Sequence, residues 1–170
     1  FLFFIIGRFS NVVGVQILTV AVGWHVYQLT GDPLDLGYIG LAQFLPALFL
    51  FLIAGYVSDK YDRRIILFFC NVAHFVVVVI LMVALWREHN DVRIIVGVLV
   101  LHGAARAFFH TAGQAILPNI VQTEAFPKAV AYSSSINKAA QLIGPAFGGG
   151  LIAWAGDWTY YVTLSMFALS

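Results

Sequence analysis

The sequence predicts an all-α integral membrane protein, and its composition supports this fold class. Of the 170 residues, 61% are hydrophobic and only 10% are charged, whereas about 25% are charged in an ordinary soluble domain. The mean hydropathy is +0.91. A small soluble domain keeps much of its surface in water, so it would not hide this much apolar area. The composition excludes a soluble enzyme domain, a disordered chain and a cytosolic nucleic-acid binder, and leaves a helical membrane bundle.

Apolar runs separated by turn signals predict six helices. The first run ends in a Gly- and Pro-containing turn at residues 30–33, and the second ends in a charged loop at 58–64. A polar stretch at 87–91 ends the third run, an amphipathic connection at 118–127 follows the fourth, and a turn at 156–157 follows the fifth. The predicted helices span residues 1–29, 36–57, 65–86, 92–117, 128–155 and 158–170, the last being incomplete.

The lengths of these runs fit helices that cross a membrane. Most contain about 20 to 28 residues, which suits a tilted spanning helix, and none alternates over about ten residues as a β-barrel strand does. The last run would rise about 20 Å, short of the ~30 Å hydrocarbon core. The chain also opens inside an apolar run without an initiator Met. We therefore expect residues 1–170 to be one transmembrane unit of a longer protein.

Basic residues near the helix ends predict how the chain crosses the membrane. One side of the predicted bundle carries four of them and the other side carries two. Because cytoplasmic loops hold the excess of Lys and Arg, the side with four, which includes the N-terminus, is predicted to be cytoplasmic. The four are Lys60, Arg63, Arg64 and Lys128, and the two are Arg87 and Arg93.

The charged loop after the second helix has a spacing that suits a gate. Asp59 falls just past the predicted end of that helix, where a carboxylate opposes the helix dipole and needs a neighbouring helix N-terminus or an Arg. Such a contact can form and break as helices tilt, and Gly55 would let another helix approach closely. The alternative is an ordinary positive-inside loop. The candidate gating residues are Gly55, Asp59, Lys60, Arg63 and Arg64.

The fifth predicted helix carries small residues at steps of four. Ala140, Gly144 and Gly148 line one face, which forms a groove for close packing of a second helix. Pro145 removes a backbone hydrogen bond and is expected to bend the helix. Bent, closely packed helices suit a hinge, and the alternative is ordinary helix packing. Together with Gly149 these residues form a second candidate motif.

Both motifs resemble those of the major facilitator superfamily, in its drug and siderophore exporter branch. The charged loop is similar to the signature between the second and third helices, with Asp62 where the common form often has Gly. The fifth-helix run is similar to the Gly-Pro-x-x-Gly-Gly antiporter motif, with Ala140 in place of its usual first Gly. The resemblance covers essentially the whole chain. It implies the N-terminal six-helix half of a twelve-helix fold, with the sixth helix truncated.

Polar stripes on the fourth and fifth helices are the candidate lining of a substrate cavity. A step of four residues rotates by about 40°, so His102, Arg106 and His110 should share a face roughly 80° wide. The resemblance implies that helices one, two, four and five surround the central cavity. The cavity candidates are His102, Arg106, His110, Asn137, Lys138 and Gln141.

Three basic residues lie within predicted spans and away from their ends, and a charge at the membrane centre costs at least about 2.5–3.5 kcal/mol. Arg106 and Lys138 lie near mid-membrane, and Arg8 lies nearer the cytoplasmic end of the first helix. Arg106 and Lys138 are expected either to face a cavity and favour an anionic substrate group, or to pair with acids from the rest of the protein. His102 and His110 are candidates for a proton relay, because the pKa of histidine lies near neutrality; the alternative is a packing role.

The resemblance implies a secondary active transporter that exports a small amphiphilic molecule across the inner (plasma) membrane. The expected mechanism is alternating access of two six-helix halves, each built from inverted three-helix repeats. Proton antiport is expected, although no carboxylate lies within a predicted span and Val15 stands where related exporters often carry an acid. The alternatives are an importer or lipid carrier of the same superfamily, and a membrane protein without transport activity.

The sequence predicts neither enzymatic activity nor a bound cofactor or metal. It contains no Gly-rich phosphate-binding loop and no convincing cluster of catalytic or metal-ligating residues, and its single cysteine, Cys70, lies in an apolar run. The expected partners are a small-molecule substrate, anionic if Arg106 and Lys138 face the cavity, the proton as coupling ion, the lipid bilayer and the C-terminal half of the same protein. No nucleic-acid partner is expected.

Overall fold

The computed structural model describes residues 2–86 and 92–170, and this part of the chain is helical without any β-strand. The expected all-α architecture is thereby confirmed. A four-residue helix, α5 (Leu117–Ile120), and a 3-10 helix, η1 (Thr123–Ala125), connect two of the bundle helices. The bundle itself consists of α1 (Leu2–Thr30), α2 (Pro33–Lys60), α3 (Arg63–Trp86), α4 (Val92–Ala115), α6 (Phe126–Ala155) and α7 (Trp158–Ala168).

Local side-chain chemistry sets the turn between α1 and α2. Gly31 has a φ of 67°, a conformation that glycine adopts without steric cost. The Asp32 carboxylate then accepts a hydrogen bond of 2.9 Å from the Leu34 backbone N–H, and Pro33 occupies the first turn of α2, where its missing N–H costs nothing. For this reason α2 begins at Pro33 rather than at the predicted residue 36.

The junction between α2 and α3 is shorter than the predicted loop. The Tyr61 backbone N–H donates to the Val57 carbonyl over 3.0 Å and closes the last turn of α2. The Asp62 carboxylate accepts from the Arg64 backbone N–H at 2.9 Å, in the manner of an N-cap for α3. Asp59 therefore lies inside the last turn of α2, whereas the sequence placed it past the helix end.

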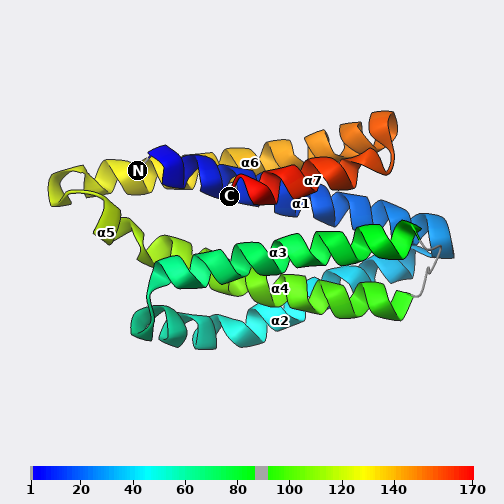
Figure 1. The fold of residues 1–170 in the computed structure, drawn as a ribbon, viewed down its shortest axis with the longest axis horizontal. Helices are drawn as coiled ribbons and strands as arrows, with labels where there is room; N and C mark the ends of the chain where they lie inside the picture. The colour runs from blue at the N-terminus through cyan, green and yellow to red at the C-terminus, as the bar shows by residue number, and fades with distance from the viewer. Residues whose placement is uncertain (1, 87–91) are drawn as a thin grey trace.

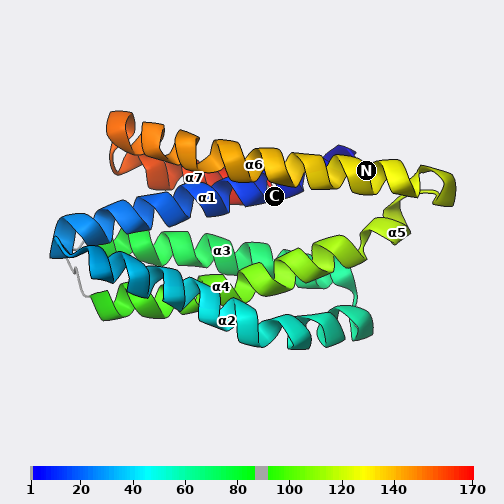
Figure 2. The same cartoon turned by 180° about the vertical axis from the view of Figure 1, so that it is seen from behind.

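The helices form two layers, α1 with α6 and α7, and α2 with α3 and α4 (Figures 1 and 2). Each layer combines helices from the first and the second half of the described chain (Figure 1). α1 packs mainly on α6 and α7, whereas α4 packs mainly on α2 and α3. α1 and α4 run in opposite directions (Figure 1). This is the arrangement expected of two inverted three-helix repeats, each with its first helix held by the other repeat.

An apolar core joins the two layers. Its members come from helices of both halves of the chain, and packing among them fixes how far each helix is rotated about its axis. Fully buried members include Leu18, Val22 and Val26 of α1, Val77 and Val78 of α3, and Leu99 of α4.

The two ends of the bundle differ in charge. The start of α1, the α2–α3 junction and the α4–α6 connection lie at one end, and the α1–α2 and α6–α7 turns lie at the other (Figure 1). Lys60, Arg63, Arg64 and Lys128 therefore gather at the first end, while Arg93 begins α4 at the second. Arg87, which the sequence also assigned to the second end, lies outside the described residues.

Within the described residues, four helices are long and apolar enough to cross a membrane by length and composition. The six predicted spans include two further helices that fall outside this set. α6 is 30 residues long but carries lysines, serines and amides that lower its hydropathy, and α7 has only 11 residues. The four segments are Phe3–Thr30, Pro33–Lys60, Arg63–Ala84 and Arg93–Ala115.

Candidate functional site

A polar pocket opens where α1, α4 and α6 meet. Its volume is about 60 Å³, several times the space that one water molecule needs. Four of the cavity candidates from the sequence lie in its wall, together with side chains of α1 and Phe109 of α4 that were not among those candidates. The lining residues are Arg8, Asn11, Val12, Val15, Gln16, Arg106, Phe109, His110, Asn137 and Gln141.

Arg8 holds the three helices together at this pocket. The side chain is 5% exposed, and its guanidinium donates through Nε to the Asn137 side-chain oxygen at 3.2 Å and through Nη1 to the Gly113 carbonyl. A Cβ at Gly113 would lie 2.8 Å from that Nη1, so the glycine makes room for the arginine. The two hydrogen bonds orient the guanidinium. Because both acceptors are neutral, they leave its positive charge uncompensated.

Two further basic side chains lie near Arg8. Arg106 lines the pocket and makes no hydrogen bond or ion pair with the described part of the chain. Lys138 does not line it, but the positive charges of Lys138, Arg106 and Arg8 all lie near enough to act on His110. His110 itself is within 3.3 Å of the Gln114 side chain. No carboxylate appears among the residues that line the pocket.

His102 lies elsewhere, although its four-residue spacing from Arg106 predicted a shared face. The side chain is fully buried against α3, with its ring centroid 4.7 Å from that of His74. The His74 ring in turn stacks on Phe167 of α7 at 5.1 Å. None of the four ring nitrogens of the two histidines has a hydrogen-bond partner within the described chain. Helix packing therefore places His102, at the start of the predicted polar stripe, against α3, and His110, at its end, in the pocket.

The small residues of α6 lie directly on α1. Ala140, Gly144 and Gly148 are all buried. A Cβ at Gly144 would meet the Gln16 Cβ at 2.5 Å, and one at Gly148 would meet the Ile17 Cα at 3.1 Å. The spacing that predicted a groove for a second helix thus corresponds to the contact with α1. Pro145 and Gly149, each one position after a buried glycine of this face, are exposed.

The candidate gating residues lie at the basic end of the bundle. Asp59 is exposed and forms no ion pair with the described residues, and the space beside Gly55 is open. The Arg63 side chain donates through Nε to the Ser58 carbonyl at 3.2 Å, and the Lys60 ammonium lies 5.8 Å from the centre of the Tyr56 ring. Asp59 and Gly55 are thus free to meet a surface outside this chain.

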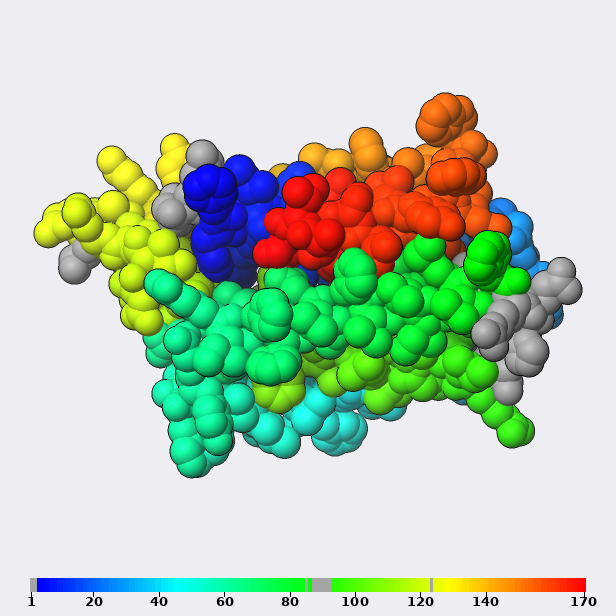
Figure 3. Space-filling view, viewed as in Figure 1, coloured from blue at the N-terminus to red at the C-terminus, as the bar shows by residue number. Residues whose placement is uncertain are grey.

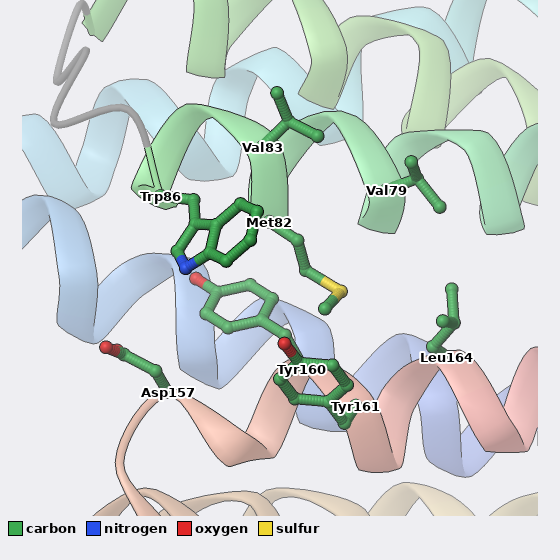
Figure 4. Close-up of a pocket in the computed structure, with 8 residues that line it drawn as sticks. All are labelled: Val79, Met82, Val83, Trp86, Asp157, Tyr160, Tyr161 and Leu164. Carbon is green, nitrogen blue, oxygen red and sulfur yellow. The ribbon is translucent and has the colours of Figure 1, made fainter.

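A larger pocket of about 320 Å³ lies between α3 and α7, on the face shown in Figure 3. Met82 and Trp86 from α3 and Tyr160 and Tyr161 from α7 line it (Figure 4). Apart from Asp157 at one end, its lining is uncharged. The α1–α4–α6 pocket, by contrast, combines charge and hydrogen-bonding groups within the apolar bundle, so it is the stronger candidate for a functional site.

Comparison with known proteins establishes the family. The chain matches the family described as "Transmembrane secretion effector" over residues 2–169. The chain belongs to the major facilitator superfamily. Membership agrees with the exchanged three-helix repeats and identifies the chain as part of a multi-pass membrane protein. The family and its curated relatives are transporters.

Curated relatives match the chain over most of its length. It is 28% identical to the staphyloferrin A transporter of Staphylococcus aureus, over 89% of this chain and 38% of the relative. It is 30% identical to the multidrug efflux pump Tap of Mycobacterium tuberculosis, over 92% of this chain and 38% of the relative. An uncharacterized MFS-type transporter of Bacillus subtilis, YfiS, is 26% identical over 92% of this chain and 36% of the relative. The chain thus spans little more than a third of these superfamily members.

Sequence reasoning missed Arg8, Asn11 and Gln16 as pocket residues. A signal for Arg8 was present, since a basic residue inside a span is a functional candidate by default. The sequence analysis placed it inside the first span, nearer the cytoplasmic end, but did not count it among the cavity candidates. Only the packing of α1 against α4 and α6 shows that its guanidinium points inward.

Proposed function

We propose that this chain is the N-terminal half of an exporter that moves a small amphiphilic molecule across the inner (plasma) membrane by alternating access coupled to proton antiport. The N-terminus and the basic end of the bundle face the cytoplasm. No catalytic step is part of the proposed activity.

The observation that carries this proposal is the polar pocket among α1, α4 and α6. Burying arginines, amides and a histidine inside an apolar helical bundle is costly, so these groups need a role that offsets the cost. The two exchanged repeats supply a symmetric frame in which such a site lies between helices that can rock together. Because its wall also contains Val12, Val15 and Phe109, the pocket suits one part of a molecule that has both polar and apolar regions.

The relatives support the outward direction. Besides the multidrug efflux pump Tap, macrolide efflux protein A of Streptococcus pyogenes is 24% identical over 82% of this chain. Two of these relatives are thus named for efflux and a third for siderophore transport. Substrate identity belongs to the whole protein, of which this chain would contribute one wall of the cavity.

The basic end of the bundle supports a gating role for the α2–α3 junction. Asp59 is exposed without an ion pair, so it is available to a helix of the other half when the cytoplasmic side closes. In the outward-open state this contact would act as a latch, and it would break when the protein opens inward.

Proton coupling is the least direct part of the proposal. Within the described chain the titratable group in the pocket is His110, and no carboxylate lines it. Either His110 or an acid from the rest of the protein would therefore carry the proton. Coupling through His102 would require the His74–His102 contact to open.

Transport by the full-length protein in inside-out membrane vesicles tests the proposal. Energised vesicles should accumulate ethidium, erythromycin or an iron-free siderophore faster than vesicles without the protein, and a protonophore should abolish the difference. Accumulation that survives the protonophore would contradict proton antiport but not export. Failure to accumulate any of the three, with uptake in whole cells instead, would favour an importer.

A further inference from the structure

We propose that the α1–α4–α6 pocket binds an oxyanion group, a carboxylate or a phosphate, of the transported molecule, with Arg8 and Arg106 as its ligands. This inference deepens the proposed function, since it names the chemistry of the substrate, and it rests on the pocket being the transport site. Arg8 is the residue that sequence reasoning did not include among the cavity candidates.

The first argument is the charge of the pocket. Arg8 and Arg106 both line it, and Lys138 lies near enough to act on the same His110. No carboxylate is present in its lining. The two hydrogen-bond acceptors of Arg8 and the Phe4 ring beneath its guanidinium are all uncharged. Cations within a membrane bundle are stable only when an opposite charge or water compensates them. An anionic ligand supplies that compensation when the site is occupied.

The second argument is the orientation of Arg8. Its five N–H donors form a planar fork, of which Nε is engaged by Asn137 and one Nη1 hydrogen by Gly113. The remaining donors have no partner in the described chain. Because both contacts and the burial of the side chain hold the guanidinium in one position, little conformational entropy is lost when a ligand binds. A planar guanidinium donates two parallel hydrogen bonds to a carboxylate or phosphate.

The third argument is the shape and lining of the pocket. A volume of about 60 Å³ holds a few small atoms, which suits one acidic group rather than a whole substrate. Val12, Val15 and Phe109 keep the dielectric around the arginines low, which strengthens an ion pair formed there. The apolar remainder of the ligand would lie toward the open side of the pocket.

Ligand binding to the purified full-length protein in detergent tests this inference. The probes are dansylglycine, which carries a carboxylate, and its neutral amide, which has nearly the same shape. Wild type should bind dansylglycine about tenfold more tightly than the amide, because a charge-assisted pair is about twice as strong as a neutral hydrogen bond. Arg8→Gln and Arg106→Gln should each lower the affinity for dansylglycine to that for the amide, because a glutamine side chain still donates a neutral hydrogen bond to either probe but carries no charge.

The matched control is Lys128→Gln, which removes the same charge from the first turn of α6, outside the pocket. It should bind both probes as wild type does. Gly113→Ala keeps every charge but places a Cβ against the Arg8 guanidinium. It should weaken dansylglycine binding alone, and it tests the site even if Arg8→Gln does not fold. Displacement of dansylglycine by inorganic phosphate would show that the site accepts both oxyanions, and no displacement would show that it selects carboxylates.

Equal binding of the two probes by wild type would overturn the inference, because the arginines would then be neutralised by an acid from the rest of the protein. Loss of preference in Lys128→Gln as well would overturn it too, since a general surface charge would be responsible. The vesicle assay separates this inference from the proposed function. If vesicles export ethidium but the purified protein binds the two dansyl probes equally, the proposed exporter function is retained and the oxyanion site is rejected. If the protein prefers dansylglycine but the vesicles export nothing, the oxyanion site is retained and the exporter function is rejected.

Discussion

At the residue scale, the described chain contains buried polar groups of two kinds. Arg8 and Asn11 have partners: the Asn11 amide donates to the Asn71 side-chain oxygen at 2.7 Å. His74 and His102 have none, although both are fully buried. A buried polar group without a hydrogen bond costs about 1–3 kcal/mol. The histidine pair is therefore either a source of instability or a group whose partner appears in another conformation.

The double substitution of His74→Leu and His102→Leu in the full-length protein separates these two roles. We expect it to leave the free energy of unfolding within about 1 kcal/mol of wild type or to raise it, because two apolar side chains replace unsatisfied polar groups. Thermal unfolding in detergent measures this. Asn11→Leu is the control with the opposite expected effect, a loss of about 1–3 kcal/mol, because it breaks a satisfied hydrogen bond.

The same double variant tests the proton-relay hypothesis for His102. If export in vesicles keeps its dependence on the proton gradient, His102 is not part of the relay and His110 remains the histidine candidate of this chain. A stable variant that exports without responding to the gradient would assign coupling to the buried pair.

At the element scale, the close contact between α6 and α1 depends on glycines, which have no side chain to separate the two helices. Gly144→Ala places a Cβ 2.5 Å from the Gln16 Cβ, so we expect a loss of about 1–3 kcal/mol in stability from overpacking. Gly150→Ala on the same helix meets open space and should be neutral or stabilise by up to about 1 kcal/mol. Equal melting temperatures for the two variants would contradict close packing of α6 on α1.

The α2–α3 junction yields a prediction about rate rather than stability. Asp59→Asn should leave the melting temperature unchanged or raise it slightly, because the carboxylate is exposed, unpaired within the described chain and opposed to the helix dipole in the last turn of α2. Export should slow by about fivefold or more, since the latch to the other half would weaken. Asp35→Asn, near the opposite end of α2, removes the same charge and should export normally. Wild-type export by Asp59→Asn would argue against gating by this loop.

At the scale of the whole molecule, charge separates the two ends of the bundle. Four basic residues gather at one end, so that end is predicted to be cytoplasmic. Single cysteines introduced by Tyr61→Cys and Asp157→Cys, in a full-length protein whose native cysteines, Cys70 among them, are replaced by alanine, should report the two sides. A membrane-impermeant maleimide should label the second variant in intact cells and the first only after permeabilisation. The reverse pattern would invert the proposed orientation.

The sequence by itself determined the fold class, the family resemblance and most helix ends. Long apolar runs must form helices in a membrane, because every backbone group needs an internal hydrogen bond there, and Gly31, Asp32 and Pro33 mark a turn through local chemistry alone. Asp59 was misplaced by a few residues because the last turn of α2 closes through the Tyr61 N–H, which no composition signal reveals.

Only the tertiary structure decided which polar side chains meet. Arg8 reaches Gly113 and Asn137 across separations of 105 and 129 residues, and no local pattern encodes such a contact. His102 and His110 shared a predicted stripe about 80° wide, yet they face α3 and the pocket respectively. The physical reason is that the spacing of two residues in the sequence fixes only the angle between their side chains about the axis of their own helix. Which neighbouring helix each side chain meets depends on how that helix is rotated, and the core that packs around it sets this rotation.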